Sequence, residues 1–154
     1  MASQYADIPA LNHLAAILID ARRLYTRAID LAKEPDAAAK IQVTLGERSA
    51  LLHDIQARVQ QLGGLATAEG SMLGVAHKAF MNVRSVFDRD LKVALEEVER
   101  GEKYFRDEVR KAMRREDVSA DTRALLGVAL DRAVTGEMRI EGKVEQVRGD
   151  HSAH

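Results

Sequence analysis

Three charged residues stand where the helical pattern of the sequence calls for apolar side chains. Arg48, Glu102 and Glu137 each interrupt the apolar stripe of a predicted helix. Asp20 flanks the stripe of the first helical segment. All four lie close to the midpoints of their predicted helices, so antiparallel packing would bring them to one level. We therefore predict a polar layer at the mid-height of a helical bundle.

This polar layer has three interpretations that the sequence leaves open. It could hold a small ion or ligand, because carboxylates suit Mn²⁺, Mg²⁺ or Ca²⁺. It could be a paired layer that fixes the register of the helices, because an unpaired buried charge is very costly. The stripe could also be displaced by one position, so that some of these residues reach solvent. The candidate metal ligands are Asp20, Glu47, Glu102 and Glu137.

Arg48 is the expected partner of Glu102 or Glu137 in the paired interpretation. Such a pair is expected to lower the pKa of the carboxylate, because a nearby cation favours the charged form.

The sequence offers little other chemistry. It contains no cysteine, which excludes disulfides and thiol catalysis. None of its five histidines belongs to a Glu-x-x-His sequence, the spacing with which one helix presents two metal ligands. We expect no catalytic residue and no cofactor, with a divalent metal as the alternative.

Composition predicts a single all-α domain. The chain has 154 residues, 46% of them hydrophobic and 4% aromatic, and Ala, Leu, Glu and Arg are abundant. The 23 basic and 24 acidic residues nearly balance, so nucleic acid and anionic membranes are not expected partners. No apolar run approaches the length of a membrane span, and no signal peptide is recognised, so we expect a cytoplasmic protein.

Apolar periodicity predicts four long helices, with Pro9 and Pro35 in the first turns of the first two. The predicted helices cover residues 9–33, 36–62, 88–114 and 119–147. Residues 1–8 are expected to form an N-terminal arm, and residues 148–154 a disordered tail.

The segment 63–87 separates the second and third helices and is far longer than the usual connection of about 2–8 residues. We predict a crossover that runs along the bundle, so that these two helices point the same way. Part of it, residues 71–86, has the pattern of a short amphipathic helix. Its adaptable side chains are a candidate surface for a protein partner, or they simply cover the bundle: Met72, Phe80, Met81 and Phe87.

Four stretches, LNHLAAILIDARRLYTRAIDLA, ERSALLHDIQARVQQLGG, GVAHKAFMNVRSVF and ALEEVERGEKYFRDEV, resemble in order and spacing a bacterial family of ferritin-like four-helix-bundle proteins of unknown function. The resemblance covers residues 9–147 and implies a fold rather than an activity. In ferritin-like enzymes two helices each give a Glu and the other two each give Glu-x-x-His to a di-metal centre. In the first three helices the corresponding positions are Leu18, Glu47, Ala50 and Val98, so only Glu47 remains a ligand among them and the other three are expected to be core residues.

The sequence therefore predicts a non-enzymatic helical bundle that acts through protein–protein contact or self-association, in bacterial stress or regulatory physiology. The alternative is a degenerate or relocated carboxylate metal site with metal-binding or oxidoreductase activity.

Overall fold

A computed structural model describes residues 3–68 and 91–152 of the chain, and every regular element in these ranges is an α-helix. The all-α prediction is therefore confirmed for the described residues. The four helices are α1 (Ser3–Leu31), α2 (Pro35–Gln61), α4 (Leu91–Met113) and α5 (Ala120–Ser152).

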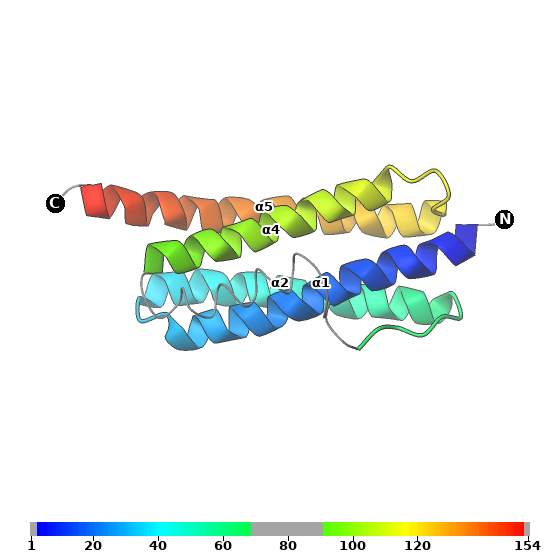
Figure 1. The fold of residues 1–154 in the computed structure, drawn as a ribbon, viewed down its shortest axis with the longest axis horizontal. Coiled ribbons are helices and arrows are strands. Elements are labelled where there is room, and N and C mark those ends of the chain that lie inside the picture. Colours follow the sequence, from blue (N-terminus) through cyan, green and yellow to red (C-terminus); the bar gives the residue numbers. More distant parts are fainter. Residues whose placement is uncertain (1–2, 69–90, 153–154) are drawn as a thin grey trace.

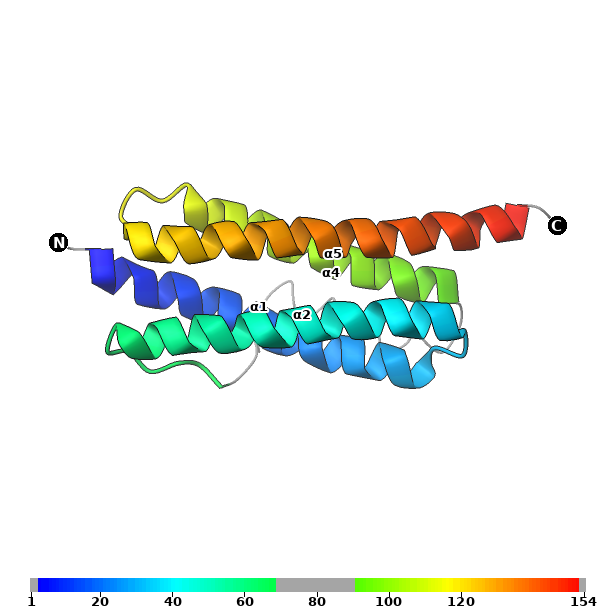
Figure 2. The same cartoon turned by 180° about the vertical axis from the view of Figure 1, so that it is seen from behind.

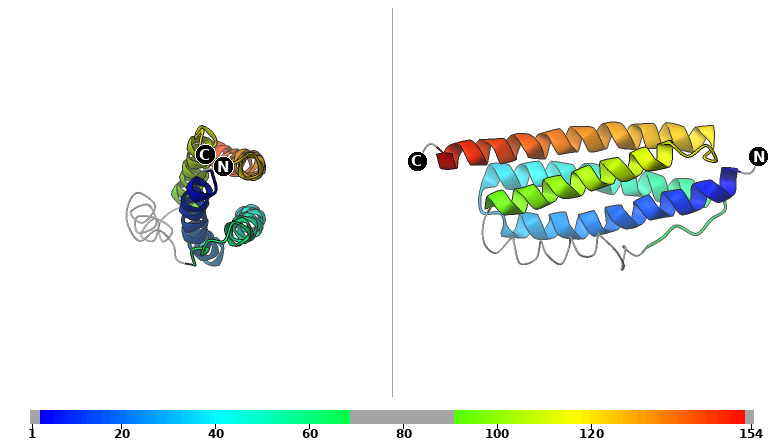
Figure 3. Two further views of the ribbon diagram at one scale, coloured as in Figure 1. Left: turned by 90° about the vertical axis from the view of Figure 1, so that its right-hand side faces the viewer. Right: turned by 45° about the horizontal axis from the view of Figure 1, so that its top comes forward.

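The helices form two antiparallel hairpins that pack against each other (Figure 1). In one hairpin α1 packs along α2, and in the other α4 packs along α5. The hairpins touch through α1 with α4 and through α2 with α5. The view from behind shows that α2 and α4 run in the same direction (Figure 2). Seen along the bundle, the four helices surround a common centre (Figure 3).

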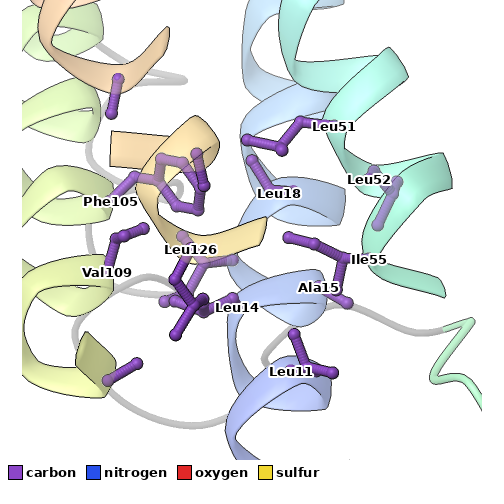
Figure 4. Packing of buried hydrophobic residues seen from close by; sticks show 14 of the residues in the cluster. Leu11, Leu14, Ala15, Leu18, Leu51, Leu52, Ile55, Phe105, Val109 and Leu126 are labelled. Atoms are coloured by element: carbon purple, nitrogen blue, oxygen red, sulfur yellow. The ribbon is translucent and has the colours of Figure 1, made fainter. Parts of the chain in front are cut away.

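Apolar stripes from all four helices fill this centre in two clusters. The larger cluster includes Leu18 of α1, Leu51 of α2, Phe105 of α4 and Leu126 of α5, each at most 1% exposed (Figure 4). The smaller cluster lies nearer the α1–α2 turn and includes Tyr25, Ile41 and Ile140. Burying this apolar surface is the main favourable contribution to folding.

The ends of α2 follow the local sequence. Glu34 is the N-cap, and its carboxylate accepts hydrogen bonds from the backbone N–H groups of Asp36 and Ala37 at 3.1 and 3.0 Å. Pro35 follows in the first turn, where its missing N–H leaves no bond unmade. At the other end Gly63 has a φ of 83°, the left-handed conformation that commonly ends a helix at glycine.

Two predicted boundaries differ from the structure. Helix α1 begins at Ser3 rather than near Pro9, so residues 3–8 are helical and do not form an arm. Pro9 lies inside α1, where it removes one backbone hydrogen bond. Helix α5 continues to Ser152, past the end expected at Val147.

Residues 69–87, which make up most of the predicted crossover, lie outside the described residues, and so does the candidate partner surface of Met72, Phe80, Met81 and Phe87. Among the helices that the structure describes, none combines the length and the apolar character that crossing a membrane requires.

Candidate functional site: a buried ion pair at mid-bundle

Arg48 of α2 and Glu102 of α4 form an ion pair in the middle of the bundle. Arg48 Nε donates to Glu102 Oε2 at 2.9 Å, and Arg48 Nη2 donates to Glu102 Oε1 at 2.8 Å. Both side chains are 0% exposed. Two parallel bonds between a guanidinium and a carboxylate give the strongest geometry available to such a pair. The structure thus brings two of the four predicted polar-layer residues together.

The guanidinium of Arg48 is held by two further contacts. Arg48 Nη2 also donates to the backbone oxygen of Arg132 on α5, at 3.0 Å. The guanidinium carbon lies 5.6 Å from the centre of the Phe105 ring, within the range of a cation–π interaction. Among the described residues Arg48 Nη1 has no hydrogen-bond partner. The pair therefore joins α2, α4 and α5 at one level.

Glycine on α5 makes room for this pair. A Cβ atom added at Gly136 would lie far inside van der Waals contact with both Arg48 Nη2 and Glu102 Oε1. Gly136 therefore lets the α5 backbone pass directly against the ion pair. Gly127, on the same helix, has nothing within 4 Å of such an added atom, so it has no comparable role.

Tyr25 of α1 completes the polar surroundings from the fourth helix. Its hydroxyl donates to the Val98 backbone oxygen at 3.5 Å, and its side chain is fully buried. Burial, followed by the negative charge of Glu102, raises the pKa of Tyr25 well above its ordinary value. This contact was not predicted, because an aromatic residue at a core position gives no signal in the sequence that its hydroxyl faces a charge.

The ionisation of the pair is governed by burial and by mutual attraction. Burial raises the pKa of Glu102 above its ordinary value, although the charge and hydrogen bonds of Arg48 oppose the shift. The expected lowering of this pKa is therefore wrong, because desolvation of a fully buried carboxylate outweighs its partner here. Burial also disfavours the Arg48 cation, but the charge of Glu102 outweighs it and the pKa of Arg48 is raised.

The other predicted polar residues lie outside this pair. Glu137 is 8% exposed and forms an ion pair with Arg106 of α4 instead. Glu47 pairs across the α2–α5 contact with Arg139, whose Nη2 lies 2.8 Å from Glu47 Oε1. Asp20 is half-buried on α1.

The carboxylates therefore do not converge on one point. In residues 3–68 and 91–152, no group of three or more His, Asp or Glu side chains is placed to hold a metal ion. At the positions that correspond to di-metal ligands, Leu18 and Val98 are fully buried. Ala50 is exposed, so its assignment to the core is wrong; the inward position of this turn of α2 belongs to Arg48. These described positions therefore do not supply the ligands of a di-metal centre.

Two further polar clusters were not expected from the sequence. Lys143 of α5 is buried and lies 2.8 Å from both Glu34 and Asp36 at the start of α2. Asp7, which is 0% exposed, accepts hydrogen bonds from the backbone N–H of Ser119 at 2.9 Å and from the Thr122 hydroxyl at 2.7 Å. Both clusters join residues distant in sequence, and no local pattern marks such pairs in advance.

A comparison with known protein families matches residues 7–115 to a family described as a domain of unknown function (DUF2383). The match covers most of the chain, which therefore belongs to this family. Arg48 and Glu102 lie within the matched region, whereas Gly136 lies beyond it. No curated protein matches the chain.

Proposed function

We propose that this family member is a ferritin-like helical bundle without catalytic activity, which acts through protein contact, including self-association. One observation carries the proposal: the three glutamates nearest the middle of the bundle are each bound by an arginine. Glu102 is bound by Arg48, Glu137 by Arg106 and Glu47 by Arg139.

The arginines occupy the role that a metal ion plays in a ferritin-like enzyme. A divalent cation needs free carboxylate oxygens, but both oxygens of Glu102 accept hydrogen bonds from Arg48. A cation that approached Glu102 would also meet the positive charge of the guanidinium, which is permanently protonated. These contacts disfavour the alternative of a relocated carboxylate metal site.

The helix directions support the ferritin-like part of the proposal. Because α2 and α4 run in the same direction, the end of α2 and the start of α4 lie at opposite ends of the bundle (Figure 1). Two antiparallel hairpins joined by one long connection is the ferritin-like arrangement.

Iron chemistry provides the test of the non-enzymatic part. Protein purified without a tag should contain well below one iron or manganese ion per chain by elemental analysis. It should also oxidise Fe(II) no faster than buffer does. Two tightly bound ions per chain, or oxidation with turnover, would show that an enzyme centre exists and would reject the proposal.

The seam between α2 and α5 is the surface that supports self-association. Thr44 of α2 and Arg139 of α5 are hydrogen-bonded across this seam at 2.9 Å. The residues directly before them, Val43 and Met138, are 52% and 65% exposed. Methionine and valine on the solvent side of a helix seam supply the adaptable apolar contact that protein interfaces use.

Sedimentation velocity tests this surface. Wild-type protein at about 100 µM, a concentration that detects weak dimers, should sediment faster than a monomer. Met138→Glu should sediment as a monomer, because a new charge would be buried in the contact. The control Gln60→Glu adds the same charge at an exposed position of α2 and should retain association. A monomeric wild type, or association unchanged in Met138→Glu, would contradict this use of the seam.

A further inference from the structure

A groove with a volume of about 570 Å³ lies on the outside of the α1–α2 hairpin, away from the ion pair. Residues of α1 from Ile19 to Asp30 form one wall, and Leu52 and Gln56 of α2 form the other. Ala68, in the loop after α2, lies at the edge of the groove. The volume falls within the range of about 300–1,000 Å³ that is typical of small-molecule sites.

The loop beside the groove is tied to both helices. Asn12 of α1 donates to the Leu65 backbone oxygen at 3.0 Å and accepts from the Thr67 N–H at 2.9 Å. Gln56 of α2 donates to the Thr67 backbone oxygen at 3.0 Å. These three hydrogen bonds fix the position of the loop, so the edge of the groove is pre-formed.

The groove combines an apolar base with a positively charged wall. Ile19 and Leu52 line it and are 9% and 2% exposed. Three exposed arginines, Arg22, Arg23 and Arg27, line it from α1. Arg23 and Arg27, four residues apart, lie on the same face of the helix, and Arg22 lies about 100° from Arg23 around it.

These arginines are available to a ligand. In the part of the chain that the structure describes, no hydrogen bond or ion pair engages their guanidinium groups. Asp30 is the one acidic residue of the described lining, so the described lining residues carry two net positive charges. Arg23 and Arg27 are also four residues apart, a spacing at which like charges slightly destabilise a helix.

We propose that this groove binds a small phosphorylated organic ligand. Guanidinium groups bind phosphate oxygens with two parallel hydrogen bonds, and two net positive charges match a phosphate dianion. The apolar base offered by Ile19 and Leu52 accommodates the organic part of such a ligand. The hydroxyl of Thr26 and the carboxylate of Asp30 supply polar contacts beside it. A pre-formed concave site favours a small molecule over an extended acidic chain.

Calorimetric titration with adenosine triphosphate, inorganic tripolyphosphate and a hexaglutamate peptide tests the proposal. In about 50 mM salt, where screening is modest, the nucleotide should bind most tightly and the peptide most weakly. Arg23→Gln/Arg27→Gln should weaken nucleotide binding by at least about tenfold, because each charge-assisted hydrogen bond contributes about that factor. Both positions are exposed, so thermal unfolding of this variant should match that of the wild type.

Arg110→Gln/Arg114→Gln is the matched control, because these two exposed arginines have the same spacing but lie outside the groove. It should bind the nucleotide with wild-type affinity. An equal loss in both double variants would show unspecific attraction and overturn the proposal. So would the absence of nucleotide binding at about 1 mM, the weak end of measurable affinity. If hexaglutamate bound more tightly than the nucleotide, the proposal would be wrong and the groove would instead fit an acidic protein segment. If tripolyphosphate bound more tightly than the nucleotide, the groove would recognise phosphate without an organic part, which also contradicts the proposal.

Discussion

Arg48 and Glu102 each carry a full charge into the centre of the bundle, where neither side chain reaches water. Replacing such a pair with apolar residues often leaves stability unchanged or improves it, whereas removing one partner is strongly destabilising. The pair is thus better suited to fixing one arrangement of α2, α4 and α5 than to raising the free energy of unfolding. Any other register of these helices would separate the two charges.

Loss of Arg48 is the first prediction at this scale. Arg48→Ala should lower the free energy of unfolding at neutral pH by about 3–5 kcal/mol, because it leaves Glu102 buried without its partner. Arg48→Met should cost less, since it keeps most of the side-chain volume. Urea denaturation of both variants and of the wild type measures these differences. Equal stability of Arg48→Ala and the wild type would contradict the buried pair.

The pH dependence follows from the raised pKa of Glu102. Without Arg48 this pKa rises further, so the folded variant binds a proton that the unfolded chain releases above about pH 4.3. The free energy of unfolding of Arg48→Met should therefore fall as pH rises from 5 to 7, by up to about 1.4 kcal/mol per pH unit. Adding Glu102→Gln should remove this slope. An Arg48→Met variant with the pH profile of the wild type would show that Glu102 does not titrate in this way.

Sequence reasoning identified the members of this pair because charged residues in an apolar stripe are visible in the pattern. It did not decide between Glu102 and Glu137 as the partner of Arg48. That choice depends on how closely α5 approaches, which Gly136 determines, and Glu137 lies one position further round the helix towards Arg106. Asp20 was predicted to join the pair because it flanks its stripe at the same height, and Glu47 was a candidate ligand because it falls at a di-metal ligand position. Neither criterion gives the direction of a side chain.

At the scale of elements, the close approach of α5 to the pair gives the next prediction. Gly136→Ala should lower the free energy of unfolding by about 1–3 kcal/mol, because the new methyl group displaces a packed ion pair. Gly127→Ala should instead stabilise the protein by up to about 1 kcal/mol, because open space surrounds that position and alanine favours a helix. Thermal or urea unfolding measures the change in stability of each variant. Two variants that change stability in the same direction would contradict the role given to Gly136.

The bodies of the helices were predictable because their apolar residues recur with helical spacing over many turns. The ends of the helices were less predictable. Pro9 was taken as the start of α1, but Asp7 is buried against Ser119 and Thr122 and holds an earlier turn in place. Burial raises the pKa of Asp7, yet the hydrogen bonds from Ser119 and Thr122 and the charge of Arg58 outweigh it, so this pKa is lowered. Such contacts arise only after the hairpins have packed.

For the whole molecule, the four helices meet through apolar clusters above and below a layer that arginine neutralises. This arrangement has the shape of a bundle that could carry a metal centre, but it lacks converging free carboxylates among its described residues. Arg48 supplies the positive charge of this layer.

Thermal unfolding with and without divalent metal distinguishes a layer neutralised by Arg48 from one that holds a metal ion. A metal ion that binds only the folded protein at 100 times its dissociation constant stabilises it by about 2.7 kcal/mol. For a domain of this size that shift corresponds to roughly 5–10 °C in the unfolding midpoint. Excess Mn²⁺ or Fe²⁺ should leave the unfolding midpoint within about 1 °C of its value in chelator, because Arg48 already neutralises Glu102. A rise of several degrees that disappears in Glu102→Gln would place a metal ion at mid-bundle and contradict neutralisation by Arg48.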